Sequence, residues 1–235
     1  MSTSSFFPSV TKLSHNESYP AISPSRPELS VKGKAVVITG GGSGIGASIA
    51  KAFAAGGSTK IAIIGRTETK LLATKHATEE EFQGTEVLAV PADITNAKQV
   101  DDAFLKISQT FGKIDVLVCN SAAMPIPHPI FSPDFDVQDW WSTFNTNILG
   151  SLYTVKGFAR YAAEGAHILN ISTCVGHMPP LEAGVSAYAA SKAGAAKLFD
   201  YIAFENPELN IVNVHPGLVD TDLSRKSGHG GMDHS

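Results

Sequence analysis

A glycine-rich turn between an apolar run and a helical pattern limits the possible folds of this chain more than any other feature. Residues 36–38 form a short β-branched run typical of a buried parallel strand, and residues 47–53 carry the apolar spacing of a helix. Between them, Gly40, Gly44 and Gly46 give the spacing G-x-x-x-G-x-G. A strand, a tight turn and a helix start direct backbone N–H groups and the positive end of a helix dipole at an anion. The stretch predicts a phosphate-binding turn, and the alternative is a simple tight connection.

Two other kinds of phosphate-binding loop are excluded by their spacing. Glycines at positions i, i+2 and i+5 cannot be found anywhere in this stretch. No Lys-Ser or Lys-Thr pair follows the glycines, as the loop of a nucleoside triphosphatase requires. The ligand of the turn therefore has to be inferred from the rest of the chain.

Apolar runs and helical patterns alternate from this turn onward. Five further strands are expected, at residues 60–67, 86–90, 114–119, 166–173 and 211–214. The expected helices include an amphipathic one at 97–111, a long one at 137–161 and an alanine-rich one at 188–204. Six apolar strands alternating with helices predict an α/β fold with a parallel sheet covered on both faces, and right-handed crossovers make it doubly wound.

Composition and length narrow the class further. The net charge of −4 provides no basic field for nucleic acid or anionic lipid, and no apolar stretch approaches the ~20 residues of a membrane span. Two cysteines are too few for a secreted disulfide framework, and no signal peptide is visible, so we expect a cytoplasmic protein. His229 and His234 have no ligand-like residues around them, so no metal site is expected.

The chain is expected to contain one domain after an N-terminal arm. Residues 1–29 are rich in Ser and Pro and show neither a helical nor a strand period, which predicts disorder. Residues 30–235 have the length of a single α/β domain.

The candidate functional residues lie where the predicted strands end. Ligands of a doubly wound sheet bind at the carboxyl ends of its strands. Residues that are far apart in the sequence would therefore line one crevice. They are residues 40–46, Gly65, Arg66, Asp93, Asn120, Ser172, Thr173 and the loop after Pro216.

Tyr188 and Lys192 are four residues apart and so share one face of a helix. The ordinary interpretation is an exposed pair on a helix surface. The functional interpretation is that Lys192 stabilises the phenolate of Tyr188. An unperturbed tyrosine has a pKa of about 10, so acid–base work near neutral pH requires the pKa to fall by about three, or ~4 kcal/mol. A nearby cation in a partly desolvated cleft, helped by a cofactor's positive charge, could supply that order of magnitude.

Together these features resemble the short-chain dehydrogenase/reductase family, in its compact single-domain branch with a Rossmann-like fold. The resemblance covers about residues 32–221 in unbroken order, and although each motif is weak alone, the ordered set is very specific. The motifs are Thr39-Gly40-x-x-x-Gly44-Ile45-Gly46, Asp93, Asn120, Asn147, Ser172-Thr173, Tyr188-x-x-x-Lys192 and Pro216-Gly217-Leu218-Val219-Asp220-Thr221.

The resemblance implies a role for each matching residue. Tyr188 would exchange a proton with the substrate oxygen, while Lys192 would hold the nicotinamide ribose and lower the pKa of Tyr188. Thr173 would donate a hydrogen bond to the same oxygen, and Asn147 would hold a water that links Lys192 to solvent. The residues implied to bind the cofactor are Gly40, Ser43, Gly44, Ile45, Gly46, Arg66, Asp93 (at the adenine), Asn120, Tyr188, Lys192, Val219 and Thr221.

The end of the second strand addresses the choice of cofactor. An acidic residue there would bond both ribose hydroxyls and repel a 2′-phosphate. This chain has Gly65 at that position, followed by Arg66, whose guanidinium suits a phosphate. NADP(H) is therefore the preferred cofactor and NAD(H) a possible one. In the alternative interpretation Arg66 only stacks on the adenine.

Three features depart from the family pattern. Thr173 stands where the family usually has serine, with Ser172 as the competing hydroxyl; strand alternation points only one of them into the site, and we predict Thr173. Residues 120–123 read Asn-Ser-Ala-Ala instead of Asn-Asn-Ala-Gly. Residues 222–235 are too few for the substrate-covering helix pair and seventh strand of the family, so we expect a domain shortened at its C-terminal end.

The function expected from the sequence is an NADP(H)-dependent interconversion of a ketone or aldehyde with an alcohol. The loops at 124–135 and 174–181 are rich in Met, Ile, Pro and Phe, which favours an apolar small-molecule substrate. One alternative is a protein that binds the cofactor but is catalytically silent because the substrate lid is missing. Another is non-redox chemistry on the same fold, such as dehydration. The family also leads us to expect a homodimer formed through the two long helices.

Overall fold

A single parallel sheet organises the computed structural model, which describes residues 19–180 and 182–226. Its strands in spatial order are β3 (Glu86–Pro91), β2 (Lys60–Gly65), β1 (Ala35–Thr39), β4 (Ile114–Cys119), β5 (Ala162–Ile171) and β6 (Asn210–Val214). Every neighbouring pair is parallel. The order reverses between β1 and β4, which creates the crevice where doubly wound sheets bind ligands. The predicted six-stranded, doubly wound sheet is confirmed.

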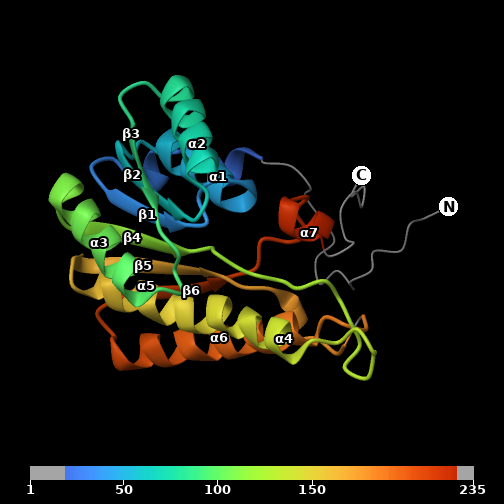
Figure 1. Cartoon of the computed structure of the whole chain (residues 1–235). Helices are drawn as coiled ribbons and strands as arrows, with labels where there is room; N and C mark the ends of the chain where they lie inside the picture. The colour runs from blue at the N-terminus through green and yellow to red at the C-terminus, as the bar shows by residue number, and fades with distance from the viewer. Residues whose placement is uncertain (1–18, 181, 227–235) are drawn as a thin grey trace.

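Helices cover both faces of the sheet, as Figure 1 shows. On one face lie α1 (Gly44–Ala55) and α2 (Glu68–Glu81). On the other lie α3 (Ala97–Phe111), α4 (Val137–Phe144), α5 (Ser151–Ala159) and α6 (Ser186–Glu205). The short α7 (Asp222–Lys226) follows β6, and single 3₁₀ turns lie at Pro20–Ile22, Pro27–Leu29 and Cys174–Gly176.

Strand alternation divides the core into two apolar layers. Val36 and Ile38 of β1 point to the α1 and α2 face, whereas Val37 points to the opposite layer. That opposite layer is built on Phe104, Phe158 and Phe199, from α3, α5 and α6, whose side chains are fully buried. Because both faces are packed, the strands are held rigidly and their carboxyl ends form a fixed platform.

The amphipathic helix predicted at residues 97–111 is confirmed with the same bounds. Its apolar stripe is buried, and the Asn96 side chain caps its first turn by accepting from Gln99 N at 3.1 Å. Gly112 ends the helix in a conformation with φ of 83°, which favours glycine.

The long helix predicted at 137–161 is interrupted. A π-helical segment at Asn145–Gly150 separates α4 from α5, which ends at Ala159. The sequence pattern did not reveal this segment, because a π turn is a short i→i+5 insertion within an otherwise α-helical stretch. The segment contains Asn147, one of the predicted site residues.

The disorder predicted for residues 1–29 stays a prediction, and the structure describes two short turns within residues 19–29. Pro20 and Pro27 each begin a 3₁₀ turn, because the proline ring sets the backbone angle that such a turn needs. Arg26 supports these turns through hydrogen bonds to Ala21 O and the Glu28 carboxylate. Residues 1–18 lie outside the described residues, as do His229 and His234.

Candidate cofactor crevice and active site

The glycine turn after β1 leaves no room for side chains at three of its positions, and a Cβ on Gly41 would lie 2.6 Å from Ile63 Cβ. A Cβ on Gly46 would lie 2.2 Å from Gly40 O, and a Cβ on Gly40 would lie 2.8 Å from Asn120 Nδ2. Gly40 and Gly44 also have positive φ angles of 68° and 53°. The first turn of α1, which follows Ser43, carries no acidic residue. The turn therefore presents bare backbone to the crevice, as an anion site requires.

Asn120 braces this turn from β4. Its Nδ2 donates to Thr39 O at 3.0 Å and to Gly40 O at 3.3 Å, while its backbone N–H donates to Thr39 Oγ1 at 3.0 Å. Ser121 N also donates to Thr39 Oγ1, at 3.1 Å. Asn120 therefore fixes the shape of the crevice by joining the ends of β1 and β4. The buried Thr39 is a positioning residue that the sequence list omitted, although its place just before the glycines could have indicated it.

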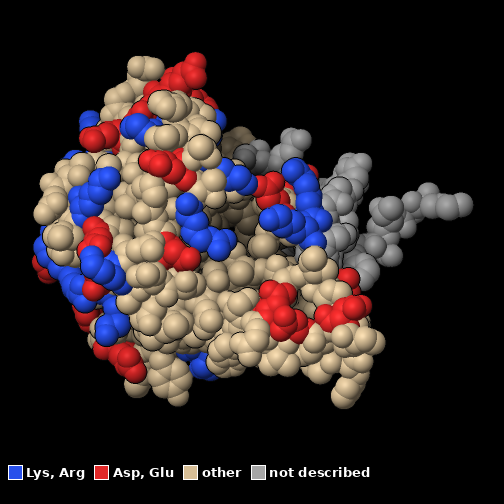
Figure 2. Space-filling view, in the orientation of Figure 1, with Lys and Arg blue, Asp and Glu red and all other residues tan. Residues whose placement is uncertain are grey.

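The loop after β6 lies against the glycine turn. A Cβ on Gly44 would lie 3.0 Å from Thr221 Cγ2, so the structure brings these two predicted residues together. Thr221 Oγ1 accepts from Ser224 N at 3.1 Å at the start of α7, and Ser224 Oγ contacts Val219 O at 3.2 Å. Figure 2 shows Lys and Arg side chains around a hollow on the side where Figure 1 labels α7.

Arg66 and Asp93 follow β2 and β3, on the same side of the molecule. Arg66 is exposed, and Gly65 before it carries no acidic side chain. Asp93 Oδ1 accepts from Thr95 N at 2.9 Å and from Thr95 Oγ1 at 2.8 Å. The carboxylate of Asp93 therefore shapes its own turn. Its contact with an adenine stays a prediction.

Tyr188 and Lys192 are not the exposed surface pair of the ordinary interpretation. Lys192 is 5% exposed and its Nζ donates to Ile171 O at 2.6 Å. Burial lowers the pKa of Lys192 to about 8, and burial together with the nearby Cys174 raises the pKa of Tyr188 to about 12. In the protein alone the pKa of Tyr188 is therefore raised, and the lowering by Lys192 together with a bound cofactor stays a prediction. Desolvation of the phenolate outweighs an ammonium that is itself disfavoured by burial.

The two candidate hydroxyls after β5 differ in their bonding. Thr173 Oγ1 accepts from Val175 N at 3.4 Å, which leaves its own proton available to a ligand. Ser172 Oγ is buried and has no hydrogen-bond partner among the described residues. The choice of Thr173 stays a prediction.

Asn147 connects the loop after β4 to α6. Its Oδ1 accepts from Ala123 N at 2.8 Å, and its Nδ2 donates to Ala123 O at 3.0 Å and to Ser191 Oγ at 2.9 Å. Ser191 Oγ in turn donates to Tyr188 O at 2.9 Å. Both amide protons of Asn147 are thus engaged, so a water could only donate to this side chain. Ser191 is a second positioning residue that the sequence list omitted.

The lowered pKa of Lys192 predicts a pH dependence of stability. The unfolded chain keeps this proton up to about pH 10.5, whereas the folded chain loses it above about 8. The unfolded state therefore binds more protons between these values, and stability rises with pH in that window. The free energy of unfolding of the wild type relative to Lys192→Met should increase from about pH 8 upward, by at most about 1.4 kcal/mol per pH unit.

Urea unfolding at about pH 7, 8 and 9 measures this difference. Burial raises the pKa of Cys119 to about 12, so folded Cys119 keeps its proton at these pH values in both proteins, and its titration in the unfolded state is common to both. Lys197→Met is the matched control, because Lys197 lies on the same helix with its side chain 70% exposed. A difference in the free energy of unfolding between the wild type and Lys192→Met that stays constant with pH would contradict the prediction.

The described residues contain neither a candidate metal site nor a membrane-spanning helix. No group of three or more His, Cys, Asp or Glu in residues 19–180 and 182–226 could hold a metal ion. Within the same ranges, no helix has the length and apolarity needed to cross a membrane.

Comparison with known proteins gives consistent matches. A family model described as short chain dehydrogenase matches residues 34–230. A short chain dehydrogenase/reductase of Claviceps purpurea is 33% identical over 94% of this chain and 75% of its own length. The short chain dehydrogenase tazN of Aspergillus terreus is 31% identical over 91% of this chain but only 47% of its own length. A short chain dehydrogenase of Burkholderia cenocepacia, solved in complex with NADP, superposes with a TM-score of 0.75 at 31% identity, over 82% of this chain and 77% of its own.

Proposed function

The chain belongs to the short-chain dehydrogenase/reductase family of oxidoreductases acting on CH–OH groups, and on that premise we propose an NADP(H)-dependent enzyme that interconverts a ketone or aldehyde with an alcohol. The observation that carries the proposal is the buried Lys192, one helical turn from Tyr188. No carboxylate of the described residues lies within 4.0 Å of its ammonium. Burying a lysine without an acidic partner is costly, which favours a functional reason for its position.

The side chains divide the work of proton transfer. The nicotinamide cofactor supplies the hydride when bound. Tyr188 keeps its proton at neutral pH because its pKa is about 12, so it is ready to donate to a carbonyl oxygen in the direction of reduction. For alcohol oxidation Tyr188 must first lose that proton, which requires an added positive charge near the phenol. Thr173 would donate a second hydrogen bond to the same oxygen, and Lys192 would hold the ribose of the cofactor.

The cofactor would lie across the carboxyl ends of β1 to β4. The residues proposed for the pyrophosphate are Gly40, Ser43, Gly44, Ile45 and Gly46. Asp93 and Asn120 would line the crevice, and Val219 and Thr221 would close it from the loop after β6. Arg66 would bind the 2′-phosphate, which the absence of an acidic residue at Gly65 supports. The Burkholderia relative solved with NADP supports the same choice.

We propose an apolar substrate and a homodimer for this enzyme. Ile126, Ile130 and Phe131, in the loop after β4, have exposed fractions of 67%, 55% and 100%. Such side chains suit a bulky apolar molecule. Val137 and Trp141 of α4 are also exposed, which supports a dimer that buries this helix. The cytoplasmic location stays a prediction.

A titration of the purified chain with NADPH and NADH, followed by nicotinamide fluorescence, tests the proposal. We expect NADPH to bind at least about tenfold more tightly, because Arg66 can form charge-assisted bonds to the additional phosphate. Arg66→Met should remove most of this advantage and leave NADH binding unchanged. Equal or tighter binding of NADH would contradict the cofactor assignment. Tight NADPH binding without oxidation by any of a broad set of apolar ketones would favour the catalytically silent alternative.

A further inference from the structure

Lys70 lies beside the glycine turn, in the first turn of α2. A Cβ on Gly42 would be 3.2 Å from Lys70 Cβ, so the stem of this lysine packs against the turn. Lys70 follows Arg66 by four residues, and its side chain is 52% exposed. A flexible four-carbon stem at this place lets the ammonium reach the mouth of the crevice. Glu68 shares the same first turn, so Arg66 alone would face a phosphate in a field of mixed charge.

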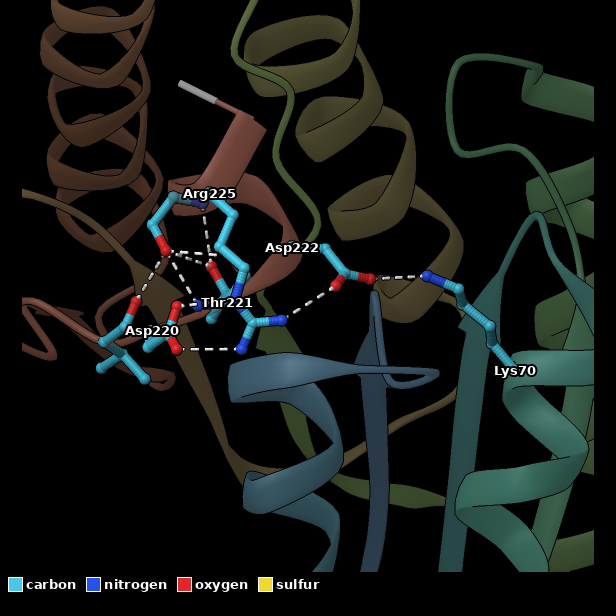
Figure 3. A network of polar contacts seen from close by, with 7 residues as sticks. Lys70, Asp220, Thr221, Asp222 and Arg225 are labelled. Carbon is cyan, nitrogen blue, oxygen red and sulfur yellow. Dashed lines mark hydrogen bonds and ion pairs between the residues drawn. The ribbon is translucent and has the colours of Figure 1, made fainter. Parts of the chain in front are cut away.

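The ammonium of Lys70 is engaged by a residue from the far end of the chain. Lys70 Nζ lies 2.7 Å from Asp222 Oδ2, across a sequence separation of 152 residues. Figure 3 shows this contact joining α2 to α7. Asp222 Oδ1 also lies 3.8 Å from Arg225 Nη1, while Arg225 forms a two-bond pair with Asp220 at 2.9 Å. Asp222 therefore has a second cation nearby if Lys70 leaves it.

We propose that Lys70 is a second cation for the 2′-phosphate of NADP(H), and that Asp222 is the anion which that phosphate displaces. The inference rests on the proposed function, because it assumes a phosphorylated cofactor in this crevice. It assigns Lys70 as a specificity-determining residue beside Arg66. Asp222 acts through Lys70, by competing for its ammonium.

The energetics of the pair permit this exchange. Both side chains of the Lys70–Asp222 pair are about half exposed, at 52% and 53%. Ion pairs in such positions contribute little to stability and are screened by salt. A phosphate offers more charge and more acceptor oxygens than a carboxylate does. Releasing Lys70 leaves Asp222 beside Arg225, so no buried or unpaired charge results.

Dissociation constants of NADPH and NADH for the full chain and four variants test the inference. Lys70→Met should weaken NADPH binding about tenfold and leave NADH binding unchanged. Lys51→Met is the matched control, because Lys51 joins α1 to the last residue of α2 through Glu81 at 2.5 Å with similar exposure. It should change neither constant. Asp222→Asn should tighten NADPH binding about threefold, with NADH unaffected. In the double variant Lys70→Met/Asp222→Asn, the second change should add nothing to NADPH affinity.

The contrary results are distinct from one another. A wild-type chain that prefers NADPH, together with a Lys70→Met variant that keeps the preference, overturns the role of Lys70 and leaves the proposed function standing. Unchanged or weaker NADPH binding by Asp222→Asn overturns the proposal that Asp222 competes with the 2′-phosphate for the ammonium of Lys70. A wild-type chain that binds NADPH no more tightly than NADH overturns both the cofactor assignment and this inference.

Discussion

Tyr188→Phe is expected to lower kcat for carbonyl reduction about a thousandfold while leaving NADPH binding unchanged. The substitution removes a single oxygen, so the packing of the ring on α6 is kept. General acid catalysis contributes about 10²- to 10⁴-fold, and phenylalanine has no proton to donate to the substrate oxygen. Lys192 is the nearest alternative donor in the sequence, but its ammonium is held by Ile171 O. Steady-state rates with NADPH and a reducible apolar ketone, together with fluorescence titration of NADPH, measure the two effects separately.

The matched control for this prediction is Tyr201→Phe. Tyr201 lies on the same helix, but its side chain is 59% exposed and far along α6 from Lys192. We expect wild-type rates from this variant. Full carbonyl reductase activity in Tyr188→Phe would refute the assignment of the proton donor. A parallel loss of activity and NADPH binding would show that the hydroxyl also binds the cofactor or supports the fold, because a purely catalytic oxygen affects kcat alone.

The sheet could be predicted almost completely because its sequence signals are local. Runs such as 36–38 and 116–119 are apolar over their full length, which in a parallel sheet follows from burial on both faces. The crevice followed from topology, because the strand order fixes which carboxyl ends meet. The contact of Thr221 with Gly44, for example, joins the segments that follow β6 and β1. Neither the sheet nor the position of the crevice depends on which side chains contact one another.

The electrostatics of the site could not be predicted in the same way. Spacing correctly placed Tyr188 and Lys192 on one helix, but it could not give the depth at which they are buried. That depth decides the sign of the change in the pKa of Tyr188, since desolvation of the phenolate acts against a nearby cation. The Lys70–Asp222 ion pair could not be predicted either. Its two residues are 152 positions apart, and no sequence motif links them.

The hydrogen bonds by which polar side chains hold the backbone of the site were not predicted, for a related reason. Asn120 was expected to line the crevice, and the sequence did not indicate that it also joins the ends of β1 and β4 through Thr39. The water expected at Asn147 stays a prediction, and the structure adds that both its amide protons bind protein atoms. A polar residue at a strand end can either contact a ligand or hold the backbone, and the sequence pattern is the same in both cases. Only the hydrogen-bond partners distinguish the two.

Gly46→Ala is expected to destabilise the fold by about 2–3 kcal/mol and to abolish measurable NADPH binding. Alanine inside a helix would ordinarily stabilise by about 0.5–1 kcal/mol relative to glycine. Here the new Cβ would lie 2.2 Å from Gly40 O and 2.6 Å from Asn120 Nδ2. Gly40 cannot move away easily, because its N–H donates to Ile64 O at 2.8 Å. The steric cost therefore exceeds the gain in helix propensity.

The two effects of Gly46→Ala have one cause and should appear together. Relief of the clash requires the glycine turn to separate from the start of α1 or from Asn120, and either movement redirects the backbone N–H groups that would face the pyrophosphate. Urea unfolding and NADPH titration measure the two losses. Ser48→Ala, on the exposed face of α1 two residues further on, should stay within about 0.5 kcal/mol of the wild type and bind NADPH normally. A stable Gly46→Ala protein with unchanged NADPH affinity would mean that the turn is only a connection between β1 and α1, because a phosphate site built from backbone could not survive its displacement.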